Sequence, residues 1–150
     1  MKNILSALSR ALDKLQDLKL KKSEPLTAED WSFLGIYYNS IERYDDALTA
    51  FRQSIHINPE DTNILYYLGK AYYKLGRYDD ALKALRQSLH INPEDADTWI
   101  GLGNVYNIIK RHDDAIEAYN QAIRINPEDF SPYLGIEIAI RKLEDADRGT

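Results

Sequence analysis

The sequence predicts an all-α protein: a right-handed α-solenoid of three 34-residue helix-turn-helix repeats, with one further helix at each end. The first observation behind this prediction is the pentapeptide Ile-Asn-Pro-Glu-Asp, which recurs at 57–61, 91–95 and 125–129. The second is that the repeats framed on it match widely: of 34 positions, the first two repeats share 19 and the last two share 14. These repeats are residues 28–61, 62–95 and 96–129.

Each repeat has the pattern of two short helices, as residues 62–95 illustrate. Gly76 suits a left-handed stop after a first helix, and Asp79 and Asp80 place negative charge at the start of the next one. Pro93 ends the second helix because it cannot continue the hydrogen-bond ladder. The apolar stripes fall at i, i+3, i+7 and at i, i+4, i+7, and consist of Leu65, Leu68, Tyr72 and of Ala81, Leu85, Ser88.

These positions resemble the tetratricopeptide repeat (TPR) family, whose pattern is a large residue, Leu-Gly, Tyr, a small-large-small set and Pro. The first repeat carries Trp31, Leu34, Gly35, Tyr38, Ala47, Phe51, Ser54 and Pro59. The second carries Leu65, Leu68, Gly69, Tyr72, Ala81, Leu85, Ser88 and Pro93. The third carries Trp99, Leu102, Gly103, Tyr106, Ala115, Tyr119, Ala122 and Pro127. The resemblance implies helix pairs stacked into a solenoid over residues 24–147.

The two ends depart from the repeat pattern. Residues 130–145 keep its phase as a single helix, interpreted as a solvating cap, and residues 146–150 are predicted to be a tail. Residues 1–23 are predicted to be an amphipathic helix and linker, in which Ala11, Leu15 and Leu18 repeat the stripe of a second helix. We interpret this helix as a degenerate N-terminal cap. A coiled-coil or swapped-dimer element and a membrane-surface helix are the alternative interpretations.

Composition and motifs favour binding over catalysis. The net charge of −5 argues against nucleic acid as a partner, and without Cys there is no thiol chemistry. No apolar run is long enough for a membrane span, so we expect a cytoplasmic protein. His56 and His90 recur one repeat apart instead of converging, so no metal site is expected. Because no nucleophile and base can be assembled, neither an enzyme nor a cofactor is predicted.

The resemblance also predicts where a partner binds. In TPR-like repeats the first helices line a concave groove, and carrying its positions onto this sequence gives a candidate peptide-binding set. Tyr and Ile side chains would anchor apolar residues of a ligand, Asn would bond its backbone, and Lys and Arg would favour acidic residues. The set consists of Asn39, Tyr66, Lys70, Tyr73, Lys74, Ile100, Asn104, Asn107, Ile108 and Arg141.

The predicted function is therefore an adaptor or scaffold that binds a protein segment in this groove. Self-assembly, by end-to-end stacking or exchange of the N-terminal helix, is the alternative, and would make the chain a homo-oligomer. TPR domains that grip acidic chaperone tails use a clamp of Lys, Asn, Asn, Lys and Arg, and such a clamp is not expected here. The matching positions hold Ser32, Ile36, Tyr67, Asp97 and Gly101.

Overall fold

A computed structural model describes residues 6, 9–10, 12–13 and 25–149 of the chain. Between residues 25 and 149 it contains helices and turns and no strand, which confirms the all-α class. The helices are α2 (Ala28–Ser40), α3 (Tyr44–Ile57), α4 (Thr62–Lys74), α5 (Tyr78–Ile91), α6 (Ala96–Ile108), α7 (His112–Ile125) and α8 (Ser131–Arg148).

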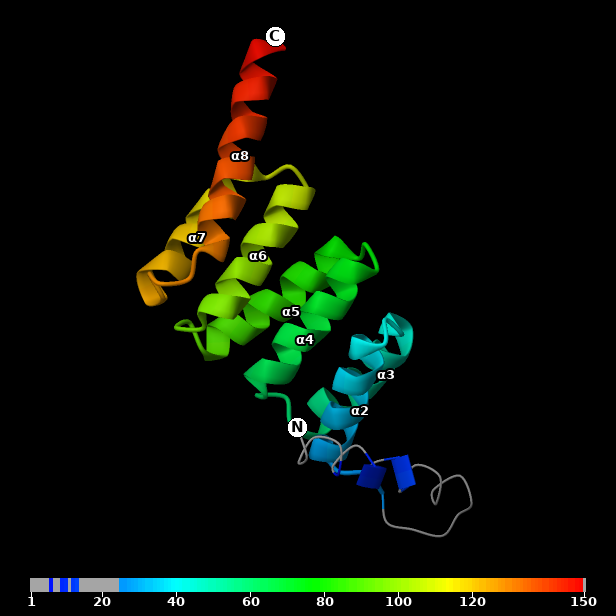
Figure 1. The fold of residues 1–150 in the computed structure, drawn as a ribbon. Helices are drawn as coiled ribbons and strands as arrows, with labels where there is room; N and C mark the ends of the chain where they lie inside the picture. The colour runs from blue at the N-terminus through cyan, green and yellow to red at the C-terminus, as the bar shows by residue number, and fades with distance from the viewer. Residues whose placement is uncertain (1–5, 7–8, 11, 14–24, 150) are drawn as a thin grey trace.

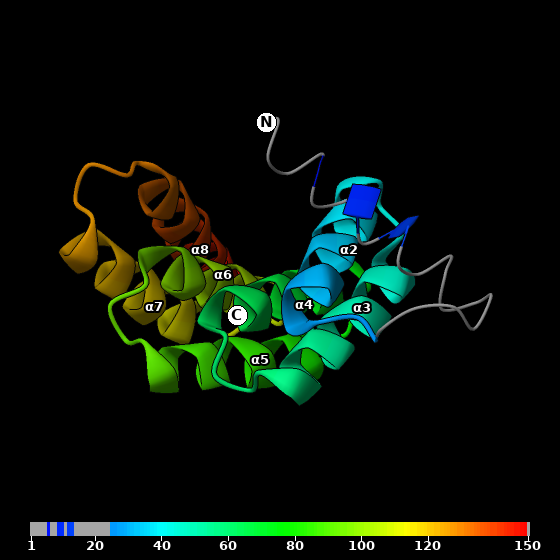
Figure 2. The same ribbon diagram turned by 90° about the horizontal axis from the view of Figure 1, so that it is seen from below.

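The helices stack as three consecutive pairs, followed by one unpaired helix. Helices α2 and α3 pack together, as do α4 and α5, and α6 and α7, whereas α8 packs on α7 and α6. Figure 2 shows α2, α4, α6 and α8 along the inner side of a curved array, with α3, α5 and α7 along the outer side. The predicted solenoid of three helix-turn-helix repeats is confirmed.

One close approach holds each pair together. A Cβ atom on Gly69 would lie 2.7 Å from Cγ of Leu85, and one on Gly103 would lie 2.6 Å from Cε1 of Tyr119. Glycine inside a helix costs about 1 kcal/mol relative to Ala, and here that cost is offset by packing against a fully buried large side chain. The same crossing contains the fully buried residues Ala47, Ala81 and Ala115.

The helix starts follow from local side-chain chemistry. The Asp61 carboxylate caps α4 by accepting a hydrogen bond from the Ile64 amide at 3.1 Å, and Thr27 caps α2 in a reciprocal capping box with Asp30. Each second helix instead begins with an acidic pair, as expected. The second Asp of each pair accepts a bond from the Arg before the helix, in Arg43–Asp46, Arg77–Asp80 and Arg111–Asp114.

The turn inside each repeat contains a left-handed residue. Gly76 has φ +73°, as the sequence predicts, and the equivalent residues Glu42 and Lys110 have φ 60° and 62°. Non-glycine residues adopt this region at a cost of about 1–2 kcal/mol. The turn geometry is therefore set by the packing of the two helices, and not by glycine alone.

Tyrosine and arginine connect successive repeats where α3 meets α4 and where α5 meets α6. The Tyr72 hydroxyl accepts a bond from Nη2 of Arg52 at 2.8 Å, and Arg52 belongs to the preceding repeat. The Arg77 guanidinium of the same repeat lies 4.8 Å from the centre of the Tyr72 ring. One repeat later, Tyr106 contacts Arg86 and Arg111 in the same way. Each ring thus carries one cation from its own repeat and one from its neighbour.

The last helix differs from the prediction in length and in character. Helix α8 extends to Arg148, into the predicted tail, where Arg148 pairs with Glu144 at 3.2 Å. Its inner side buries Ala139, but Tyr133 and Ile140 on another side are each 45% exposed. The predicted solvating cap therefore has an apolar surface, which no other helix between residues 25 and 149 covers.

The predicted N-terminal helix and its linker lie mostly outside the described residues. Of that segment the structure describes Ser6, Ser9, Arg10, Leu12 and Asp13, all of them exposed. No helix in the described part of the chain is long and apolar enough to cross a membrane.

Candidate functional site

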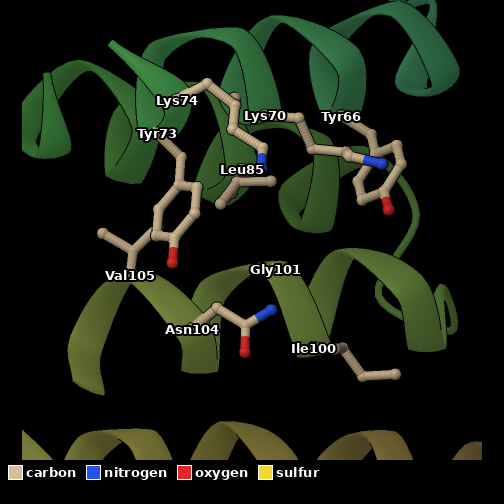
Figure 3. Close-up of a pocket in the computed structure, with 10 residues that line it drawn as sticks. Tyr66, Lys70, Tyr73, Lys74, Leu85, Ile100, Gly101, Asn104 and Val105 are labelled. Carbon is tan, nitrogen blue, oxygen red and sulfur yellow. The ribbon is translucent and has the colours of Figure 1, made fainter. Parts of the chain in front are cut away.

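A cavity of about 320 Å³ lies on the inner side of the array, between α4 and α6. Figure 3 shows Tyr66 and Ile100 at one end of it, and Tyr73 and Lys74 at the other. The cavity is lined by Tyr66, Gly69, Lys70, Tyr73, Lys74, Leu85, Ile100, Gly101, Asn104 and Val105.

The cavity exists because one side chain is missing. A Cβ atom on Gly101 would lie 3.4 Å from Cδ2 of Leu85, in ordinary contact, so the space beyond it is open. One repeat earlier the same position holds Tyr67, whose ring stacks on Phe51 with centroids 6.0 Å apart and 18° between the planes. Glycine at this position therefore exposes the apolar floor that Tyr67 covers in the preceding repeat.

Two cations border the cavity without an acidic partner. The Lys70 ammonium lies 5.2 Å from the centre of the Tyr66 ring, and Lys74 is exposed one turn further along. Within the described ranges, no carboxylate forms an ion pair with either ammonium. Burial raises the pKa of Tyr66 to about 12, and the nearby carboxylate of Asp97 adds to this shift. The site is therefore basic along α4 and more acidic beside the start of α6.

A chain of hydrogen bonds sets the orientation of the Asn104 amide. The carbonyl of Gly135 can only accept, so Nδ2 of Asn107 donates to it at 3.0 Å and also donates to the Tyr119 hydroxyl at 3.2 Å. The hydroxyl then donates to Oδ1 of Asn104 at 2.7 Å. The donor group of Asn104 is consequently turned toward the cavity, as Figure 3 shows.

Six of the ten residues predicted for the groove line this cavity, and four do not. The Asn107 amide is hydrogen-bonded to Tyr119, Gly135 and the His112 ring, so it supports the cavity wall without facing the cavity. Arg141 pairs with Glu137 at 2.6 Å on α8. Ile108 is 48% exposed but does not line the cavity. Asn39 is half-buried in α2, where its Oδ1 has no hydrogen-bond partner among the described residues.

Sequence reasoning missed the floor of the cavity. Leu85 was identified only as a packing residue, and Gly101 only as a position that does not match the chaperone clamp. A comparison of the sixth position of each repeat marks Gly101 as a candidate, because Tyr67 is replaced there, but it marks Gly135 equally and does not separate the two. The floor residues that the prediction omitted are Gly69, Leu85, Gly101 and Val105.

No group of His, Cys, Asp and Glu that could hold a metal ion occurs among the residues that the structure describes. The cavity itself is lined mainly by apolar and aromatic side chains, with two amines and one amide. Such a lining binds another molecule by contact, charge and hydrogen bonds.

Comparisons with solved structures show the same fold. A crystal structure of MamA has a TM-score of 0.79 and 29% identity over 84% of this chain and 74% of its own. The TPR domain of Sgt2 from Aspergillus fumigatus has a TM-score of 0.76 and 22% identity over 81% and 82%. The first TPR domain of Spaghetti (RPAP3), bound to the HSP90 peptide SRMEEVD, has a TM-score of 0.76 and 15% identity over 79% and 94%.

The family itself is shown by the sequence comparison. The tetratricopeptide repeat model matches residues 34–95 and 66–130, which together cover more than half of the chain. No curated protein sequence matches significantly. The eight recurring positions, the stacked helix pairs and this match agree, and the chain belongs to the tetratricopeptide repeat family.

Proposed function

We propose that this chain is a cytoplasmic adaptor or scaffold, without catalytic activity of its own, that binds a segment of a partner protein in the α4–α6 cavity. The segment supplies one large apolar side chain, an acidic residue next to it and a backbone carbonyl. The observation that carries this proposal is the apolar floor left open by Gly101, bordered by two amines without an acidic partner in the part of the chain that the structure describes.

The apolar side chain of the ligand packs over Leu85 and Gly101, between the rings of Tyr66 and Tyr73. Burial of a Leu-sized or Phe-sized side chain contributes about 1.5–3 kcal/mol. Aromatic walls add contact area at little cost in side-chain entropy, which makes this contact the anchor of the interface.

Lys70 and Lys74 attract an acidic residue of the ligand and so determine where along α4 it binds. A related solved structure holds the peptide SRMEEVD, which contains three acidic residues, so an acidic ligand suits this fold. The five clamp positions of chaperone-binding relatives hold other residues in this chain, including Asp97. We therefore propose an acidic ligand that is gripped differently, with its charge along α4 and away from Asp97.

A backbone carbonyl of the ligand accepts a hydrogen bond from Nδ2 of Asn104. This donor is held toward the cavity by the Tyr119 hydroxyl, so it loses little freedom when a ligand binds. The contact selects an extended segment, in which carbonyl groups remain free.

The test is a selection from a displayed library of random 12-residue peptides on the full chain. Selected peptides are expected to carry one large apolar residue beside Asp or Glu. Gly101→Tyr, which copies Tyr67 of the preceding repeat, should abolish their binding, because the new ring fills the cavity. The double variant Lys70→Glu, Lys74→Glu should weaken binding by at least about tenfold.

The matched control is Lys83→Glu on α5. It makes the charge change of each single replacement, half that of the double variant, at an exposed position that does not line the cavity. Affinities are measured by calorimetry and stability by urea unfolding, so that a folding defect is recognised. Peptides that bind Gly101→Tyr as well as they bind the original chain would rule out this cavity as the binding site.

A further inference from the structure

Helix α8 occupies the place of a first helix in a fourth repeat. Its buried residues Pro132, Gly135 and Ala139 lie 34 positions after Thr98, Gly101 and Val105 of α6. A Cβ atom on Gly135 would clash with the Tyr119 ring, so α8 is packed closely on α7. The docking of α8 therefore continues the array by half a repeat.

No helix between residues 25 and 149 occupies the opposite half of that repeat. In α4 and α6 the positions that face the repeat's own second helix are covered; Leu65 and Leu102 are 1% and 5% exposed. On α8 the equivalent face carries Tyr133, Ile136 and Ile140, which line an open groove together with Glu137, Arg141 and Glu144. The face has the pattern of a helix contact, but no helix between residues 25 and 149 lies on it.

The chain contains one more segment with the pattern of a second helix. Such helices carry a stripe at i, i+4, i+7, which is Ala81, Leu85 and Ser88 in α5 and Ala115, Tyr119 and Ala122 in α7. The same spacing recurs at Ala11, Leu15 and Leu18, ahead of the first complete repeat. A second-helix pattern thus precedes the first complete repeat, and a first helix without a partner among the described residues follows the last one.

The charges of the two parts are complementary. Residues 1–23 contain six Lys or Arg and two Asp, which leaves 13 basic against 22 acidic residues in the rest of the chain. Glu137 and Glu144 border the open groove of α8 together with Arg141, and the two carboxylates pair with Arg141 and Arg148 of the same helix. The attraction of a basic segment therefore comes from the acidic array as a whole.

The reach of the chain favours a second copy over the same molecule. Leu26 is buried against Leu34 and Ala50 at the α2 end, which is opposite α8 in Figure 1. The eight residues from Leu18 to Leu26 span at most about 26–29 Å. Three helix spacings separate α2 from α8, and a helix docked in the groove beyond α8 adds a fourth. At about 8–10 Å each, these four spacings amount to about 32–40 Å, which exceeds the reach of the linker.

We propose that residues 4–18 of one copy dock on the Tyr133–Ile136–Ile140 face of α8 in a second copy and complete a fourth repeat between the two molecules. Glu137 stands where the other repeats have Gly, so its side chain keeps the docked helix further from α8. Leu18 stands where the complete repeats have Ser or Ala, and its larger side chain fills that extra distance. The contact is head-to-tail, so each molecule offers one donor segment and one acceptor face.

The test compares full-length variants by light scattering after size-exclusion chromatography. The original chain is expected to increase in mass with concentration, starting from the 17.3-kDa monomer. Leu15→Glu removes the donor and Ile140→Arg removes the acceptor, and each should raise the concentration needed for association by at least about tenfold. Mixing the two variants should restore a dimer, because one retains the acceptor and the other the donor.

Two matched controls keep the test specific. Gln16→Glu makes a similar charge change off the stripe, and Ile57→Arg makes the Ile140 change at another exposed isoleucine, 52% exposed at the end of α3. Both should associate like the original chain. A chain that is monomeric at every concentration, association that survives Leu15→Glu, or a variant mixture that stays monomeric would each overturn the proposal.

Discussion

The α4–α6 and α6–α8 junctions are built from the same repeat positions, yet one is open and the other is closed. Both have glycine at the sixth position, Gly101 and Gly135. Gly101 faces Leu85, which is too small to fill the space, whereas Gly135 faces the Tyr119 ring at contact distance. The difference teaches that a cavity in this array depends on a pair of residues, one from each repeat. Neither glycine alone predicts it.

The largest effect is expected from Gly135→Ala at the closed junction. The added methyl group would overlap the buried Tyr119 ring, and overpacking of this kind costs about 1–3 kcal/mol. Urea unfolding should show a lower midpoint with an unchanged slope. A neutral result would mean that α8 moves away from α7 without cost, and the junction would then not be closed by packing.

Tyr119→Phe tests the hydrogen bonds that connect the two junctions. The variant keeps the ring but removes the hydroxyl between Asn107 and Asn104, which should cost about 0.5–1.5 kcal/mol of stability. Peptide binding should weaken as well, because the Asn104 amide is free to turn. Unchanged affinity alongside reduced stability would show that Asn104 takes no part in binding.

Gly101→Ala should raise the free energy of unfolding, whereas Gly135→Ala should lower it. Its methyl group meets Leu85 at an ordinary distance, and Ala is favoured over Gly inside a helix by about 0.5–1 kcal/mol. The variant should therefore unfold at a higher urea concentration while reducing the depth of the cavity. Destabilisation would indicate that the inner side of α6 is more tightly packed than the structure shows.

The smallest effect concerns the ionisation of two tyrosines, Tyr66 at the α4–α6 junction and Tyr119 at the α6–α8 junction. Burial raises the pKa of both Tyr66 and Tyr119 to about 12, above the ordinary value of 10. Since the folded state holds these protons more tightly, their contribution to stability is complete below pH 10 and is lost as the pH rises toward 12. In an ultraviolet titration of tyrosinate, a bound acidic peptide should raise the pKa of Tyr66 further and leave the pKa of Tyr119 unchanged. The variant Tyr119→Phe shows which of the two titration steps belongs to Tyr119.

The sequence predicts the array well because its period is repeated three times. Each helix start, the left-handed Gly76 turn and the tight Gly69 and Gly103 crossings follow from local rules that recur every 34 residues. The cavity is less predictable because it depends on the combination of Gly101 with Leu85, which belong to different repeats. A missing side chain is not a motif, so its effect is visible only when equivalent positions are compared.

The role of an asparagine could not be read from its position. Asn104 and Asn107 both lie on the inner helix α6, and both were predicted to bind a ligand. Only the structure shows that Asn107 is held by Gly135 and His112, which leaves Asn104 as the donor at the cavity. The sequence contains Tyr119, but it does not show that the Tyr119 hydroxyl lies between the two amides and so assigns their roles.

The contacts of Tyr72 with Arg52, and of Tyr106 with Arg86, have no counterpart at the last helix. One repeat later the two positions hold Asn120 and Ile140, both exposed. In a linear array, cooperativity is the sum of nearest-neighbour couplings, so one weaker link lets a terminal unit open by itself. Amide hydrogens of α8 should therefore exchange by local opening, ahead of those in α4 to α6.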